Sequence, residues 1–355
     1  MITIDDKKIT DFTLDNKNVV KIQDATTLKV LWEKTTPTPP ENEYFYIENT
    51  YNGNNTITLT TTKYGTPSST NYSTTVQYSK DKENWTNLTF STSTPKTISM
   101  SKGERVYFRN DNGKFNYTDG NNWYYTTFTA TNSHIVGGNI VSLLKYTSME
   151  TFTLTKEGCF RKLFKGDESL TDSRNLIFPN TTSSYCFSDM FHNCRNMKTS
   201  PLTLPATTLK DYCYSDMFLN CNKLTTTPNI LATTLAEECY SGMFVRCTSL
   251  TSAPALPITT LVDSCYSNMF FECTALTSAP ELPAKVLVRG CYQGMFYGCS
   301  SLKNVTSYAD NIDASYCLSE WLSGVAESGT FYNYGSASYP RGKDGIPSGW
   351  TIVKN

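Results

Sequence analysis

The 355-residue sequence predicts a β-rich, multidomain protein whose C-terminal half is an α+β solenoid. Three observations support this fold class. A Thr/Pro segment, TTPTPP at 35–40, separates a short N-terminal stretch from the rest of the chain. Apolar and polar residues then alternate up to about residue 146, as they do in half-buried strands. From there onward one residue pattern recurs every 26 or 27 positions, which is typical of stacked repeats.

Residues 1–36 contain short alternations, such as Phe12/Leu14, and we expect a small N-terminal β module that anchors the protein. Residues 37–43 follow as a Thr/Pro linker, because proline removes backbone donors and favours extended chain. Residues 44–146 alternate with turn signals between the runs, which predicts an Ig-like β-sandwich. The alternating positions include Ile57/Leu59, Val76/Tyr78, Leu88/Phe90, Val106/Phe108 and Tyr124/Thr126/Phe128.

The segment SKDKENW at 79–85 resembles the Asp-box hairpin turn, in which Asp81 ties the turn and Trp85 packs beneath it. Glu83 stands where that pattern usually has glycine. Since this turn is mainly structural in other families, we expect a structural role here.

Cysteines mark the repeats, because all twelve lie between 159 and 317. The first of each pair recurs at steps of 27, 27, 26, 26, 26 and 26: Cys159, Cys186, Cys213, Cys239, Cys265, Cys291 and Cys317. The second lies eight residues later: Cys194, Cys221, Cys247, Cys273 and Cys299. The two outer copies have Asp167 and Val325 at this place, as expected of terminal repeats modified into caps.

Each copy also has an apolar pair at offsets +4 and +5 from its first cysteine, and most copies have Leu or Met at +11. If offsets 0 to +8 form an α-helix, then 0, +1, +4, +5 and +8 share one face that points to the core. A proline-containing segment follows, such as TSAPALP at 251–257, and it fits a short strand. We therefore expect about seven repeats of one short helix and one short strand over 147–326, and a C-terminal cap over 327–355.

The repeat pattern resembles the leucine-rich repeat, specifically the BspA-like subfamily found in surface proteins of gut Bacteroidetes and in associated phages. The resembling positions in one copy are Met269-Phe270, Cys273, Leu276 and Leu282-Pro283. The stretches around KGERVYFRNDNGK and GIPSGWTIV look like the modules that flank such repeats. This resemblance covers about 150–325 and implies adhesion or protein binding, and it transfers no catalytic residue.

The cysteines allow three interpretations. A disulfide within one copy would join residues eight apart on a helix, about 12 Å along its axis, which exceeds the Cα separation that a disulfide accepts. Disulfides between neighbouring copies remain an alternative. Zinc usually needs closer spacings, and the chain has only two histidines, His134 and His192. We expect buried free thiols that act as small hydrophobes, with no metal and no cofactor.

Three surfaces are candidates for binding. Offset +6 would lie opposite the core face of the helix and is mostly apolar, which predicts a face that docks on a partner. It consists of His192, Leu219, Val245, Phe271 and Tyr297. The alternative is a short or 3₁₀-like helix that turns this offset inward.

The second candidate is a ladder of hydroxyl side chains on the predicted strands, and its alternative is a solvated β surface without a partner. It consists of Thr199, Ser200, Thr225, Thr226, Thr251, Ser252, Thr277 and Ser278. The third candidate is a glycan platform of exposed aromatics, Trp123, Tyr124 and Tyr125, beside an Asn-rich turn. Strands use aromatics for packing just as readily, which is the alternative there.

The charge balance, with 31 basic and 32 acidic side chains, provides no field to attract nucleic acid. No segment approaches the ~20 apolar residues of a membrane-spanning helix, so we expect no membrane insertion. The start, MITIDDKKITDF, has four charges where a secretory signal needs an apolar run, and we expect no export signal. The sequence has no P-loop, G-x-G-x-x-G, G-x-S-x-G or metal-spaced His cluster, so we expect no enzyme, although the paired carboxylates of a glycosidase can come from distant segments.

The expected function is that of a non-enzymatic phage virion protein, a head or tail fibre or appendage made in the host cytoplasm. Its N-terminal module, where IQDATTLKVLWEK resembles modules of phage appendages, would bind other virion proteins. Its distal domains would adhere to a host surface protein or glycan. A homo-oligomer is expected because appendages are usually symmetric. The alternatives are a BspA-like adhesin on the bacterial cell surface and an accessory module of a carbohydrate-active enzyme.

Overall fold

The computed structural model describes residues 43–64, 72–113, 115–119 and 122–354, and the strand residues 3–4, 7–14, 20–24 and 30–33 near the N-terminus. The chain divides into two compact units, Met1–Glu43 and Tyr44–Asn355. The prediction of a β-rich, multidomain protein is confirmed. The expected linker lies outside the described residues, apart from Glu43 at its end.

The first unit is a four-stranded antiparallel sheet with the order β1-β2-β3-β4. Its strands are β1 (Thr3–Ile4), β2 (Lys7–Leu14), β3 (Val20–Asp24) and β4 (Val30–Glu33).

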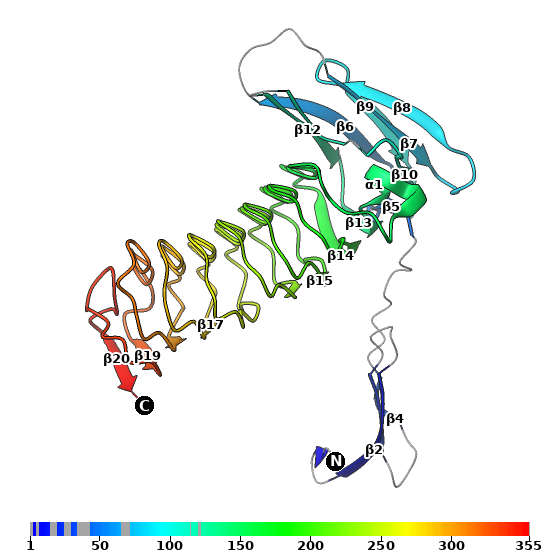
Figure 1. Cartoon of the computed structure of the whole chain (residues 1–355). Coiled ribbons are helices and arrows are strands. Elements are labelled where there is room, and N and C mark those ends of the chain that lie inside the picture. The colour runs from blue at the N-terminus through cyan, green and yellow to red at the C-terminus, as the bar shows by residue number, and fades with distance from the viewer. Residues whose placement is uncertain are drawn as a thin grey trace. The chain divides into compact units, whose positions relative to one another are not determined.

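The second unit begins with two sheets (Figure 1). Buried aromatic side chains from both sheets form a common core. Their orders are β14-β13-β5-β10-β7-β8 and β11-β12-β6-β9. Phe45 of the first sheet meets Phe128 of the second, with ring centroids 5.6 Å apart. The elements are β5 (Phe45–Asn49), β6 (Asn55–Tyr64), β7 (Ser73–Ser79), β8 (Thr86–Ser91), β9 (Lys96–Met100), β10 (Arg105–Arg109), β11 (Tyr117–Asp119), β12 (Asn122–Ala130), β13 (His134–Asn139), the helix α1 (Ser142–Lys145) and the 3₁₀ turn η1 (Tyr146–Ser148).

The Asp-box segment forms the turn between β7 and β8. Asp81 Oδ1 accepts the backbone N–H groups of Glu83 and Asn84 at 2.9 and 2.8 Å, and these bonds, with that from the Asn84 side chain, lower the pKa of Asp81. Lys82 takes the left-handed conformation of the turn, with φ 68°. The Trp85 ring packs against the guanidinium of Arg109 at 3.9 Å. The side chains of this turn hold a hairpin together, in agreement with the structural role expected from the sequence.

The first copy of the repeat is joined directly to this β domain. Strand β14 (Leu170–Ile177) pairs in parallel with β13. The Phe164 ring lies 5.9 Å from Phe45 and 6.3 Å from Phe128, so one aromatic core runs from the β domain into the repeats. The copies then stack side by side along the chain (Figure 1).

The prediction of a short α-helix in each copy is wrong. Offsets −1, +3 and +7 have positive φ in every copy, between 48 and 78°, as at Asp189, Asn193 and Gly242. An α-helix does not accommodate a left-handed residue every four positions. The segment is instead a run of turns in which every second N–H bonds three residues back, as Met243 N–H does to Tyr240 O at 3.2 Å. The N–H groups between them donate to the next copy, as Phe244 does to Met269 O at 2.9 Å.

The residues expected on the core face are nevertheless buried. A turn run that repeats every four residues keeps offsets 0, +1, +4, +5 and +8 on one side, much as a helix does over so short a length. Offset +5 forms an unbroken column of stacked phenylalanines, in which Phe244 lies 5.4 Å from Phe218 and 5.5 Å from Phe270. Offset +1 forms a second column, in which Tyr240 lies 5.6 Å from Tyr214. Like residues therefore pack on like residues from copy to copy.

All twelve cysteines are buried and unpaired. The second cysteine of each pair donates its thiol to the backbone carbonyl of a phenylalanine in the preceding copy, as Cys247 Sγ does to Phe218 O at 3.2 Å. The same bond recurs at 3.0 to 3.1 Å from Cys194, Cys221, Cys273 and Cys299. Burial raises the pKa of Cys159, Cys213 and Cys299 to about 12. These thiols fill the core and satisfy carbonyls between copies.

The thiols should be inert to a thiolate-selective reagent in the native protein, because burial keeps them protonated and out of reach. After unfolding without a reductant, a colorimetric thiol assay should count all twelve per chain. A deficit of one pair would mean that a disulfide forms between copies.

The C-terminal copies end in a parallel sheet with the order β17-β18-β19-β20. The short strands that follow β14 are β15 (Thr203–Leu204), β16 (Asn229–Ile230), β17 (Ser278–Leu282), β18 (Asn304–Ser307), β19 (Gly329–Asn333) and β20 (Trp350–Lys354). Two buried tryptophans close this end. Trp321 Nε1 donates to Gly345 O and Trp350 Nε1 to Ala326 O, both at 2.8 Å.

Candidate functional site

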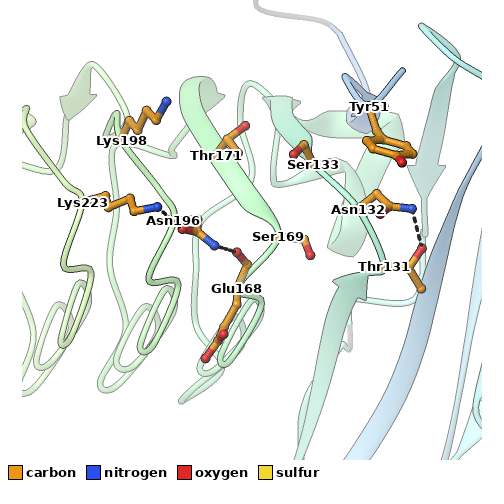
Figure 2. Close-up of a pocket in the computed structure, with 10 residues that line it drawn as sticks. All are labelled: Tyr51, Thr131, Asn132, Ser133, Glu168, Ser169, Thr171, Asn196, Lys198 and Lys223. Atoms are coloured by element: carbon orange, nitrogen blue, oxygen red, sulfur yellow. Dashed lines mark hydrogen bonds between the residues drawn. The ribbon is translucent and has the colours of Figure 1, made fainter. Parts of the chain in front are cut away.

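A polar groove of about 420 Å³ lies where the β domain meets the first three copies, and we call it the junction groove. Figure 2 shows Tyr51 and Asn132 on one side, Lys198 and Lys223 on the other, and Ser169 between them. Its lining residues are Tyr51, Thr131, Asn132, Ser133, Glu168, Ser169, Thr171, Asn196, Lys198 and Lys223. Hydroxyls, amides, two ammonium groups and one aromatic ring thus face a common space.

The aromatic side of the groove is a tight turn after β5. The Tyr51 side chain is 44% exposed, although its backbone N–H is bonded to Asn49 Oδ1 at 3.0 Å. The buried Asn49 amide also donates to Gly53 O at 2.8 Å and to Ser101 O at 2.9 Å. A Cβ on Gly53 would come within 3.1 Å of the Tyr51 ring, so the ring rests against this glycine. The turn thereby fixes an exposed aromatic ring at one end of the groove.

A second buried amide, Asn55, fixes the neighbouring wall. Its Oδ1 accepts Asn132 N–H and Thr131 Oγ1–H, both at 2.9 Å, and its Nδ2 donates to Asn132 O at 2.8 Å. A loop held by several bonds to one buried side chain loses little further entropy when a ligand binds. This side of the groove is therefore preorganised.

The opposite wall comes from three consecutive copies that are linked by side-chain bonds. Asn196 Nδ2 donates to Glu168 O at 2.7 Å, and Lys223 Nζ donates to Asn196 Oδ1 at 2.7 Å. The Glu168 carboxylate lies 3.5 Å from Arg195 Nη1. Among the described residues, no carboxylate pairs with Lys198 or Lys223, so both positive charges of this wall remain uncompensated.

A buried His–Asp contact braces the two walls. His134 Nε2 of β13 lies 3.0 Å from Asp167 Oδ2, and both side chains are almost fully buried. The two atoms lie close together without the alignment of a hydrogen bond. Asp167 Oδ1 accepts Ser169 N–H at 3.1 Å, and His134 Nδ1 lies 3.1 Å from Asn132 O. Asp167 occupies the place of the second cysteine, so the modified terminal copy provides the contact to the β domain.

The Thr/Ser ladder continues from the junction groove along the copies. Thr225 N–H donates to Lys198 O at 3.0 Å, so the ladder and the cationic wall share adjacent backbone. Thr225, Thr226, Thr251, Ser252, Thr277 and Ser278 are exposed and Thr199 is partly buried, whereas Ser200 is buried. Ser200 is thus not part of the surface, because its N–H and Oγ are bonded to Thr226 Oγ1 at 2.9 and 3.2 Å.

The offset +6 column is partly buried in all five copies. It is therefore neither the fully exposed docking face nor the inward-turned core position that the sequence allowed. It does not lie opposite the core, because the segment is a run of turns and not a helix. Phe271 and Tyr297 stack on each other with ring centroids 4.6 Å apart. The two rings thus bury part of the apolar surface of this column against each other.

The three aromatics predicted to form a glycan platform are not exposed together. Tyr124 and Tyr125 are buried, so the expectation of exposure is wrong for both. Trp123 is partly buried and lies 6.0 Å from Tyr185 of the second copy, and Arg161 of the first copy lies 5.6 Å from the Trp123 ring. These side chains pack the β domain against the repeats.

A charged cluster lies on the turn side of the first copies. Asp189 Oδ1 lies 2.7 Å from His192 Nδ1 and 3.3 Å from Lys165 Nζ. Burial alone would raise the pKa of Asp189, but the bond to His192 and the charges of Lys165 and Lys162 hold this pKa well below its usual value. Burial, together with the charge of Asp189, raises the pKa of Asp216 in the next copy to about 6.

The substitution Asp216→Asn should stabilise the protein at about pH 8 by about 1 to 3 kcal/mol. A folded-state pKa above the unfolded value means that ionisation of Asp216 opposes folding. The gain should therefore shrink as the pH falls through 6 and vanish near pH 4. Thermal melts of the variant across this range test the prediction. A gain that is independent of pH would contradict it, and the exposed Glu281→Gln variant should show no such trend.

No group of three or more His, Cys, Asp or Glu side chains is arranged to hold a metal ion in the part of the chain that the structure describes. That same part contains no helix with the length and apolar character required to span a bilayer. Comparison with protein-family models, curated proteins and solved structures finds no match to this chain. The junction groove therefore has to be interpreted from its own chemistry.

Sequence reasoning missed most of the groove. It selected Thr199 and Thr225 near the cationic wall, but neither Tyr51 nor Lys198 nor the His134–Asp167 pair. One available signal was the replacement of cysteine by a carboxylate at Asp167, together with a histidine at the end of the β domain. A second was the tyrosine within the turn YNGNN at 51–55, because an aromatic in a polar turn is often exposed.

Proposed function

We propose that the repeats form a leucine-rich-repeat solenoid of the BspA-like type, behind an Ig-like β-sandwich and before a C-terminal cap. The support is the recurring pattern of Cys, Met-Phe and Leu, the backbone bonds between copies and the continuous aromatic columns. A solenoid of this kind offers a long continuous face for binding.

The function that the geometry supports best is non-enzymatic binding of an extended ligand, a glycan or a host surface protein, in the junction groove and along the Thr/Ser ladder. The observation that carries this proposal is the preorganised aromatic side of the groove, where Asn49 and Asn55 hold an exposed Tyr51 beside open polar groups. Among the described lining residues Glu168 is the sole carboxylate, and Arg195 lies against it. Binding is therefore better supported than glycoside hydrolysis, which needs a pair of carboxyl groups.

A glycan array with the full chain tests this function. Tyr51→Ala should lose the array signal, because it removes the one aromatic ring among the described residues that line the groove. Tyr316→Ala, which removes a tyrosine that is 68% exposed outside the groove, should leave it unchanged. An array without signal, combined with the absence of binding to a purified host surface protein, would overturn the proposal. So would equal signals from the two tyrosine variants.

The place of action that we propose is a phage virion, where residues 1–36 attach the chain to other virion proteins and the solenoid is displayed as a homo-oligomer. The support is the resemblance of the N-terminal segment and of the repeats to phage appendages. Mass spectrometry of purified virions should detect the chain. Its detection in bacterial envelope fractions alone would favour the second candidate, a BspA-like surface adhesin.

A further inference from the structure

We infer that the junction groove binds an acidic saccharide, with a sugar ring against Tyr51 and its carboxylate or sulfate group between Lys198 and Lys223. This inference rests on the proposed binding function and specifies the ligand class. The groove itself gives the reasons, namely one open aromatic ring, two uncompensated ammonium groups and a lining of amides and hydroxyls.

The aromatic end fits the apolar side of a sugar. Because Gly53 has no side chain, the Tyr51 ring lies against it on one side, and its remaining surface is free to pack on C–H groups. The nearby Asn132 and Ser133 provide polar groups for hydroxyls. An apolar ring surface beside hydrogen-bonding groups is suited to a ligand that is itself amphipathic, as a pyranose ring is.

The cationic end places two lysines without a carboxylate partner among the described residues on one wall of the groove. Some other exposed lysines of the repeats, such as Lys210 and Lys303, also have no carboxylate partner in the described part of the chain. Further exposed cations are matched by carboxylates of adjacent copies, as in Arg246–Glu272 at 2.6 Å and Arg289–Asp263 at 3.1 Å. Lys198 has no such partner among the described residues, and Lys223 contacts the neutral amide of Asn196. Two positive charges without a carboxylate partner thus line the same groove.

The single carboxylate of the groove does not oppose an anion strongly. Arg195 lies 3.5 Å from Glu168, so the negative charge there is compensated. The formal net charge of −1 leaves no general attraction for polyanions, and the selectivity must therefore come from Lys198 and Lys223. An acidic peptide would supply carboxylates too, but the side chains that carry them have no apolar ring face to pack on Tyr51.

Titration calorimetry with two matched pairs of probes tests the inference. The pairs are trigalacturonic acid with its methyl ester and a sulfated trisaccharide with its desulfated form. At least one acidic probe should bind about tenfold more tightly than its neutral partner, the effect of one charge-assisted hydrogen bond. The preference should decrease at high salt, since the lysines are exposed to solvent.

Variants locate the effect. Lys198→Ala and Lys223→Ala should each reduce the affinity for the acidic probe about tenfold and leave the neutral probe unaffected. Lys303→Ala is the matched control, because this exposed lysine occupies the same offset as Lys198, +12, and does not line the groove. Tyr51→Ala should weaken both members of a pair. Thermal melts should show that all four variants fold as the parent does.

The outcomes separate this inference from the proposed function. Equal affinity for acidic and neutral probes, or full affinity of Lys198→Ala for the acid, would overturn the inference and leave a neutral-sugar site. Tighter binding of a triglutamate peptide than of either acidic sugar would replace the saccharide by an acidic peptide. Absence of binding to all these probes, with a blank array, would contradict the proposed function as well.

Discussion

The substitution Asp167→Ala is expected to lower the free energy of unfolding by about 2 to 4 kcal/mol, because it removes the partners of two polar groups. It leaves the buried His134 without its carboxylate partner and removes the acceptor of the Ser169 N–H. The His134 side chain is fully buried, so water cannot replace its lost contact. Urea denaturation monitored by tryptophan fluorescence measures the change in stability. Ligand binding at Tyr51 should weaken too, because the His134–Asp167 contact also supports the junction groove.

A double variant provides the control. His134→Leu combined with Asp167→Cys removes the imidazole and the carboxylate together and places at 167 the thiol that the inner copies have at this offset. Because replacing both members of a buried pair costs far less than removing one, the double variant should recover most of the stability lost in the single one. If both variants were equally unstable, or if Asp167→Ala had no effect, the His134–Asp167 contact would not be a major contribution to stability.

The substitution Phe270→Ala should cost about 3 to 5 kcal/mol, the usual cost of removing a buried phenylalanine. Phe270 is fully buried and stacks between Phe244 and Phe296 at 5.5 and 5.7 Å, so the change opens a cavity in the middle of a continuous column. Since each copy contacts only its neighbours, this loss should weaken the connection between the two halves of the stack.

The neighbouring residue is a matched control of the same type. Phe271→Ala at offset +6 removes a partly buried ring whose one aromatic contact among the described rings is Tyr297, and we expect a loss of about 1 kcal/mol or less. Thermal and urea unfolding of both variants compare the two columns directly. Equal losses would mean that offset +6 belongs to the core as fully as offset +5.

The sequence predicted the β-rich fold class and the buried positions of the repeats well, because spacing and apolar pattern are local properties. Residues such as Met243 and Cys247 recur at fixed offsets and are buried as expected. The helix was predicted wrongly because a period of four resembles a period of 3.6 over nine residues. Asp189, Asn193 and Gly242 carried the missing information, since Gly, Asn and Asp tolerate the left-handed backbone that each fourth residue adopts.

The groove could not be predicted in the same way. Its residues come from the turn at 51–53, the loop at 131–133 and three repeats, and no local pattern links such distant segments. The aromatics at 123–125 were selected because they adjoin an Asn-rich turn, yet Tyr125 lies 4.6 Å from Lys162 Nζ of the first copy and is covered by it. Burial between two modules depends on how they meet, which strand alternation does not encode.

Hydrogen–deuterium exchange of the full chain, with and without the saccharide that gives the strongest array signal, tests the central claim most directly. We expect slower exchange in peptides that contain 49–53, 131–133, 168–171 and 196–198, because their backbone surrounds the junction groove. Peptides that contain 242–246 and 268–272, on the turn side, should exchange unchanged. Protection confined to those turn segments, with none at the groove, would contradict ligand binding in the junction groove.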